Sequence, residues 1–495
     1  MDKKELLQSL HFGERIAEEE GEILFRYFVQ TENWRKLESG KTDIVYGPKG
    51  SGKSALYFLL LDNDGELFDR NVILAPCVNI QGAPIFKDFS SDPPSSENEL
   101  VGLWKLYFLT VLSDRFKDFG FKGKWASELR KALELSDLVK GSQSLSSKLN
   151  RAAKYIKRFF RPSSAETTVQ LDPITQMPIG VTGKISFSEP NEEARSAGIF
   201  GLDELLAFAN RELEEQGFSI WLLLDRLDVA FSEDQQMEKL ALRALFRVYL
   251  DMASYPKINS KIFLRDDIWK RIIDGGFREA SHITRHVTIS WNRASLLNLI
   301  IRRLLHNRQI LGHYNIETEK ILGSVEEQEK TFYRVFPDQV EVGPNKSSTL
   351  DWILSRTRDG RQINAPREII HFLNELVDEQ LRKYEIGGAE PSDDLLFTRA
   401  VFKEALPAVS QVRLNQTIYA EYADLKPYIE ALRESKTAQT DESLEQLWEV
   451  DYDQTRSIAN SLVEIGFFEK RSKKGDYWVP FLYRDALDMI QGSSA

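Results

Sequence analysis

A run of small residues that ends in lysine and serine has the composition of a phosphate-binding loop. Glycine at positions 47, 50 and 52 lets backbone N–H groups wrap around phosphate oxygens. The ammonium group of Lys53 can neutralise β- and γ-phosphate oxygens, and the hydroxyl of Ser54 can bind Mg²⁺. The spacing is that of the Walker A motif. We therefore expect a nucleoside triphosphate, ATP with Mg²⁺, to contact Gly47, Pro48, Lys49, Gly50, Ser51, Gly52, Lys53, Ser54 and Ala55.

A carboxylate must accompany this loop on the Mg²⁺ side of the phosphates. The apolar run Leu222–Leu224 ends in Asp225, which we expect to be that catalytic and metal-binding group. Hydrolysis also needs a residue that orients the attacking water or accepts its proton, and Asp228 is the candidate, with Glu233 as the alternative. An apolar strand that ends in aspartate is common by itself, so the assignment of Asp225 depends on the phosphate loop.

A further cation must stabilise the negative charge that develops on the γ-phosphate. Three arginines lie at positions that suit this role. Arg265 closes an apolar strand, Arg285 precedes another, and Arg367 begins a helix after a proline. A surface or helix-capping role is the competing interpretation for each of them, because the chain contains 65 lysine and arginine residues.

The elements around these residues alternate between strands and helices. A short strand at 42–46 leads into the phosphate loop, and a helix at 54–61 follows it. Further strands are predicted at 72–76, 218–225, 261–265 and 286–291. This order predicts an α/β fold: a P-loop NTPase core in which helices layer a parallel sheet.

Three domains are expected from the changes in pattern along the 495 residues. Residues 1–291 form the ATPase domain, with an N-terminal helix from Glu14 to Leu37 and an insertion at about 141–191 that contains a β-hairpin (167–171 with 181–187). Residues 292–434 form a helical lid. Residues 435–495 form a winged helix, which begins with a polar linker at 435–443 and continues as two helices, a stop at Gly466 and two strands.

Composition limits the other functions open to the chain. The single cysteine, Cys77, excludes an internal disulfide framework, and the six histidines show no paired ligand spacing, so we expect no metal besides nucleotide-bound Mg²⁺. No apolar run reaches the ~18 residues that a membrane span needs. We therefore expect a cytoplasmic protein with no membrane partner. The net charge of −11 argues against non-specific coating of nucleic acid.

Two local basic clusters leave nucleic-acid binding open. The run Lys148–Arg161 carries six basic residues and no acidic one, which suits phosphates, an acidic partner, a membrane surface or a simple solvated helix face. The wing of the last domain contains Lys470, Arg471, Lys473 and Lys474. The preceding helix has only Arg456 as a base, so protein contacts or nucleotide sensing are favoured over DNA for this domain.

Together, Walker A, the strand end Asp225-Arg226-Leu227-Asp228, the lid with Pro366-Arg367 and the winged helix resemble the AAA+/STAND group of P-loop ATPases. Within that group the chain looks most like bacterial KAP-like and origin-recognition-like ATPases, many of which occur in phage-defence operons. The resemblance implies that Asp225 and Asp228 bind Mg²⁺ and prepare water. It also implies that Arg285 reaches a neighbouring subunit and that Arg367 senses the γ-phosphate. Arg226 replaces the usual glutamate, which implies slow, switch-like turnover.

Three functional hypotheses follow. The first is an oligomeric ATP-hydrolysing switch that acts in antiviral defence by controlling a separately encoded effector protein. The second is a DNA-binding ATPase of replication or partition type, and the third is a nucleotide-binding scaffold that does not hydrolyse ATP. Adenine and guanine preference, the trigger and the oligomer number have no readable pattern in the sequence.

Overall fold

The computed structural model describes residues 2–77, 97–135, 185–186, 200–227, 235–471 and 476–493. The chain forms two compact units. The sheet unit comprises Glu32–Gly47 and Leu56–Thr288. The helical unit comprises Met1–Thr31, Pro48–Ala55 and Ile289–Ala495, so the phosphate loop groups with the C-terminal half of the chain. The predicted three-domain boundaries stay a prediction.

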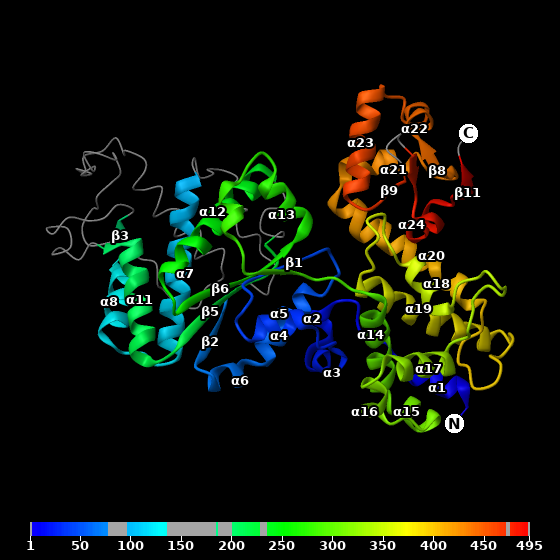
Figure 1. Cartoon of the computed structure of the whole chain (residues 1–495), viewed down its shortest axis with the longest axis horizontal. Coiled ribbons are helices and arrows are strands. Elements are labelled where there is room, and N and C mark those ends of the chain that lie inside the picture. The colour runs from blue at the N-terminus through cyan, green and yellow to red at the C-terminus, as the bar shows by residue number, and fades with distance from the viewer. Residues whose placement is uncertain are drawn as a thin grey trace. The chain divides into compact units, whose positions relative to one another are not determined.

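The sheet unit is built on five parallel strands (Figure 1). Their order across the sheet is β2-β5-β6-β1-β7. The strands are β1 (Ile44–Gly47), β2 (Val72–Pro76), β5 (Ser219–Leu224), β6 (Ile258–Arg265) and β7 (His286–Thr288). A parallel sheet needs helical crossovers, which cover both of its faces and explain why its strands are almost wholly apolar.

Helices cover the two faces of this sheet. Tyr46, Leu222 and Leu264 belong to a hydrophobic core shared with α7, α8, α11, α12 and α13. Phe263, the neighbour of Leu264 in β6, packs instead against Tyr57 of α5, with ring centroids 5.9 Å apart. The helices are α4 (Glu32–Glu38), α5 (Lys53–Asp62), α6 (Asp64–Asp69), α7 (Glu97–Asp118), α8 (Lys124–Leu135), α11 (Leu202–Gln216), α12 (Gln235–Asp251) and α13 (Asp266–Ile273). The predicted α/β class, a parallel sheet layered by helices, is confirmed.

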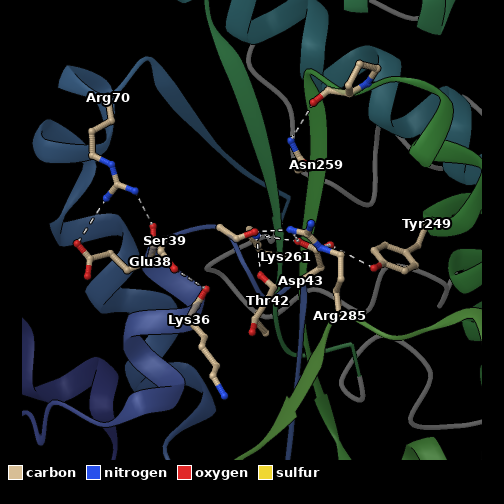
Figure 2. A network of polar contacts seen from close by, with 12 residues as sticks. Lys36, Glu38, Ser39, Thr42, Asp43, Arg70, Tyr249, Asn259, Lys261 and Arg285 are labelled. Atoms are coloured by element: carbon tan, nitrogen blue, oxygen red, sulfur yellow. Dashed lines mark hydrogen bonds and ion pairs between the residues drawn. The ribbon is translucent and has the colours of Figure 1, made fainter.

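A charge network joins the middle of β6 to the residues that lead into β1 and β7 (Figure 2). The carboxylate of Asp43 accepts from Lys261 Nζ at 2.8 Å and Tyr249 Oη at 3.2 Å, and it pairs with Arg285 Nε at 2.6 Å. The Lys261 side chain is 1% exposed, and burial lowers the pKa of its ammonium group despite the nearby Asp43 charge. Asp43 is therefore the counter-ion that allows a lysine to lie inside the sheet.

We predict that Asp43→Ala lowers the free energy of unfolding by about 3–5 kcal/mol, because it leaves the buried Lys261 ammonium without its carboxylate. Urea unfolding of the nucleotide-free protein measures this. Glu32→Ala is the matched control, since its 3.8 Å pair with Arg35 is about two-thirds exposed and should contribute little. Equal midpoints for the two variants would contradict the assigned role of Asp43.

The helical unit has one continuous hydrophobic core that reaches from Leu6 to Leu487. Its helices up to residue 356 are α1 (Lys3–Ser9), α2 (Ala17–Glu20), α3 (Leu24–Tyr27), α14 (Arg293–His306), α15 (Arg308–Tyr314), α16 (Thr318–Leu322), α17 (Val325–Val335) and α18 (Thr349–Arg356). They are followed by α19 (Pro366–Glu385), α20 (Val401–Arg413), a π-helix (Leu414–Tyr419) and α21 (Lys426–Glu430). Among the described helices, none is both long and apolar enough to cross a membrane.

The predicted helix from Glu14 to Leu37 is wrong. It is replaced by three short helices, α2, α3 and α4, because Gly21 takes a φ of +52° that a continuing helix excludes. Glu20, at the end of α2, is buried against Arg303 of α14, with which it forms an ion pair. The acidic residues of the predicted helix thus include a buried carboxylate that pairs with an arginine of another helix.

The C-terminal residues form the predicted winged helix. Helices α22 (Asp441–Trp448) and α23 (Tyr452–Glu464) precede Gly466, at φ +80°, and the strands β9 (Glu469–Lys470) and β10 (Asp476–Trp478). The last elements are α24 (Phe481–Arg484) and β11 (Ile490–Ser493).

The polar linker predicted at 435–443 is wrong, because residues 436–440 form β8 (Lys436–Thr440) beside β10 and β11. Thr437 and Gln439 are 1% and 4% exposed, and hydrogen bonds to Gly492 and Lys436 carbonyls satisfy them. Thr440 then caps α22 through the Ser443 N–H. The polar composition predicted a linker, but backbone hydrogen bonds allow these polar side chains to be buried in a strand.

Candidate functional site

The phosphate loop connects β1 to α5, as the sequence predicts. Gly50 and Gly52 have φ values of +78° and +99°, which favour glycine. Within the loop, the Ser51 N–H donates to the Pro48 carbonyl at 3.2 Å, and Lys53 Nζ donates to the same carbonyl at 2.9 Å. The loop is therefore a tight turn whose motif lysine folds over its own backbone.

Three consecutive residues of the loop contact three separate segments of the helical unit. Lys49 forms an ion pair with Glu421, which follows the π-helix. A Cβ atom added to Gly50 would lie 3.2 Å from Cβ of Arg367, so the start of α19 packs directly on the loop backbone. The Ser51 carbonyl accepts from the indole N–H of Trp291 at 2.9 Å.

Sequence reasoning named Arg367 but missed Glu421 and Trp291. Neither carries a motif, and both lie far from the loop along the chain. A π-helix immediately before Glu421 is the one local feature that marks this region, since such segments are frequent at functional sites.

Arg367 is the predicted lid arginine, and the structure brings it to the loop. Its Nε atom is buried, and no described residue is its hydrogen-bond partner. A buried N–H group without an acceptor costs free energy, and an anion that accepts from this Nε–H would offset that cost.

A cavity of about 490 Å³ in the helical unit is lined in part by Arg367. Burial lowers the pKa of a second lining residue, Arg15, and the positive charge of Arg367 lowers it further. A third, Arg413, is neutralised by Glu368 at 2.8 Å, with both side chains under 10% exposed. The lining residues are Glu14, Arg15, Ile16, Glu19, Arg367, Glu368, His371, Val409, Val412, Arg413, Gln416 and Thr417. Its volume is in the range of small-ligand sites.

In the sheet unit, the carboxyl ends of the strands carry the other predicted groups. Asp225 follows β5 and is 6% exposed, Gly47 ends β1, and Arg265 ends β6, which lies between them. Strand spacing puts the ends of β1 and β5 about 10 Å apart. Arg265 is held by Asp267 through bonds of 2.7 and 3.0 Å. Arg226 has a φ of +54°, a conformation that is costly for a residue with a side chain and that redirects the chain after Asp225.

Arg285 lies at the amino-terminal ends of the strands, opposite to the carboxyl ends that carry Asp225. It precedes β7, whose first residue, His286, pairs with Ile44 at the start of β1. Its guanidinium is half exposed and bound to Asp43. The structure does not bring Arg285 to the edge that carries Asp225.

Several predicted residues cannot be placed. Asp228, Glu233, Lys473, Lys474 and the run 148–161 lie outside the described residues. The predicted hairpin does too, except for β3 (Ile185–Ser186), which pairs in parallel with β4 (Phe200–Gly201). Within the described part of the chain, no three His, Cys, Asp or Glu side chains gather as a metal site.

No protein-family model matches the chain, and neither does any curated protein. Among solved structures, the Aeropyrum pernix ORC2 protein in its ADPNP-ADP complexes is 12% identical, with coverage of 92% of this chain and 90% of that chain and a TM-score of 0.42. The ORC1 protein of the same organism in complex with DNA is 11% identical (93% and 93% covered, TM-score 0.35). The ADP form of ORC2 is 13% identical (90% and 86% covered, TM-score 0.33). Likenesses at this level assign no function to the chain.

Proposed function

We propose that the chain binds ATP and hydrolyses it slowly, and that the nucleotide state controls the helical unit. One observation carries this proposal: the Walker A loop has three consecutive residues in contact with Glu421, Arg367 and Trp291. Phosphates that occupy the loop would change the electrostatic and steric environment of all three contacts. A loop built in this way couples phosphate binding to the elements that hold it.

The phosphates would be held by loop N–H groups and by Lys53, whose ammonium now bonds to the Pro48 carbonyl. Ser54 and Asp225 are the proposed Mg²⁺ ligands, since hydroxyl and carboxylate oxygens suit this ion. When bound, Mg²⁺ neutralises charge on the β- and γ-phosphate oxygens. The buried Asp225 carboxylate would hold it, and Asp228 would orient the attacking water.

The cavity beside Arg367 is the proposed site for the base and sugar. Arg367 contacts the loop and lines the cavity, so one ligand can reach both. Ile16, Val409 and Val412 supply apolar surface for a planar base, while Gln416 and Arg15, which are 3.3 Å apart, supply polar groups. Most ligand pockets combine these two kinds of lining.

The finer role rests on the family resemblance. In this role the chain is an oligomeric switch in antiviral defence that controls a separate effector. Arg285 would leave its ion pair with Asp43 and contact a neighbouring subunit. The half-exposed position of Arg285 is compatible with this exchange.

A DNA-binding ATPase is the second candidate. The wing carries Arg471, about half exposed and stacked 3.9 Å from the Trp478 ring centroid, next to Lys470. Guanidinium groups held in this way can bind phosphates of a duplex.

The test is to incubate the purified protein with Mg-ATP and to follow phosphate release and mass in solution, with and without duplex DNA. Release that accompanies a change in mass supports the switch. A DNA-dependent rise that falls steeply with salt favours the second candidate. Binding without release makes the protein a nucleotide-held scaffold, and absence of binding overturns the proposal.

We predict that Arg367→Ala weakens ATP binding about tenfold and ADP binding less than about twofold, because a lid arginine acts on the γ-phosphate. Competition titrations with both nucleotides measure the ratio. Arg382→Ala, at the exposed end of the same helix, is the control. Equal losses for ATP and ADP would assign Arg367 to a part of the nucleotide that both share.

A further inference from the structure

Trp291 makes a polar contact that no motif accounts for. It follows β7 and lies just before α14, and its ring packs partly buried against the core of the helical unit. Its Nε1–H donates to the Ser51 carbonyl at 2.9 Å, and Ser51 is 1% exposed. An indole nitrogen is a donor only, so the contact recognises a carbonyl in one orientation.

The orientation of this carbonyl decides where the next N–H points. In a planar trans peptide, the carbonyl of Ser51 and the N–H of Gly52 point in opposite directions. A carbonyl held toward Trp291 therefore directs the Gly52 N–H to the other side of the loop. Phosphate-binding loops depend on such inward N–H groups.

Glycine at position 52 makes this orientation unstable without an external partner. Gly52 has a φ of +99°, and glycine also adopts negative φ values at little cost. The peptide plane between Ser51 and Gly52 can thus rotate and present its carbonyl to the phosphate side. A carbonyl oxygen there would repel phosphate instead of binding it.

We propose that Trp291 is a positioning residue of the phosphate site, whose indole N–H locks the Ser51–Gly52 peptide with its N–H available to phosphate. This inference rests on the proposed nucleotide binding and adds a residue outside the Walker A motif to it. The alternative is that Trp291 acts only through hydrophobic packing of its ring.

Trp291→Phe separates the two, since phenylalanine keeps an aromatic ring and lacks the N–H. Trp352→Phe is the matched control: Trp352 is 3% exposed in the same unit, and its Nε1 has no hydrogen-bond partner among the described residues. The affinities for Mg-ADP, for pyrophosphate and for adenosine are measured by calorimetry on the full chain. Urea unfolding without ligand reports the stability of each variant.

Trp291→Phe should weaken Mg-ADP and pyrophosphate binding about tenfold and leave adenosine binding unchanged, as expected for one misdirected donor to phosphate. Trp352→Phe should keep wild-type affinity even where its unfolding midpoint falls. Equal affinities for the two variants, or equal losses for adenosine and ADP, would overturn the role of Trp291. A wild-type protein that binds none of the three ligands would instead overturn the proposed function itself, and this inference with it.

Discussion

Replacement of Lys53 by alanine should weaken ATP binding at least about 100-fold, a larger loss of nucleotide affinity than we expect from Arg367→Ala or Trp291→Phe. The substitution removes the ammonium group that would bond to β- and γ-phosphate oxygens. The same group now donates to Pro48 at 2.9 Å, a bond that phosphate oxygens would replace. Titration with a fluorescent ATP analogue measures the loss.

Lys41→Ala provides the comparison for this result. Lys41 is an exposed lysine shortly before β1, so its substitution by alanine removes one positive charge without altering the loop. Its affinity should stay within about twofold of wild type, because exposed charges contribute little at a distance. If Lys53→Ala binds ATP as tightly as Lys41→Ala does, the loop is not the phosphate site.

Asp225→Asn should lower phosphate release by about 100-fold or more, with ATP binding reduced far less. Asparagine keeps the size of this 6% exposed side chain and removes the charge that would hold Mg²⁺. Single-turnover phosphate release, paired with binding titrations in Mg²⁺ and in EDTA, separates the two effects. The loss should vanish when both proteins are compared in EDTA.

Asp274→Asn is the control, because this exposed carboxylate lies after α13, on no strand end. If Asp225→Asn keeps wild-type turnover, Asp225 is not the Mg²⁺ ligand. The acidic residues within 228–234 would then be the next candidates. Absence of turnover in the wild type, with binding intact, would favour the scaffold hypothesis for the whole chain.

Local sequence was sufficient for the core of the fold. The strands β1, β2 and β5 are short apolar runs, as burial on both faces of a parallel sheet demands. β1 ends at Gly47, and Asp225 follows β5. The winged-helix order was also readable, because Gly466 and the helix caps mark boundaries within a few residues. Prediction failed at β8, because its polar residues are typical of a loop. Thr437 and Gln439 are nevertheless buried there, with hydrogen bonds to backbone carbonyls.

Residue types within short windows were enough to predict the phosphate loop and the order of strands and helices. The groups that surround the loop become visible only in the folded chain. Trp291 and Glu421 lie 240 and 372 positions from their partners Ser51 and Lys49, and single hydrogen bonds over such separations leave no periodic pattern. The Asp43 network likewise joins strands that are distant along the chain. These contacts exist because folding brings together groups whose charge and hydrogen-bonding needs are met only once they are buried side by side.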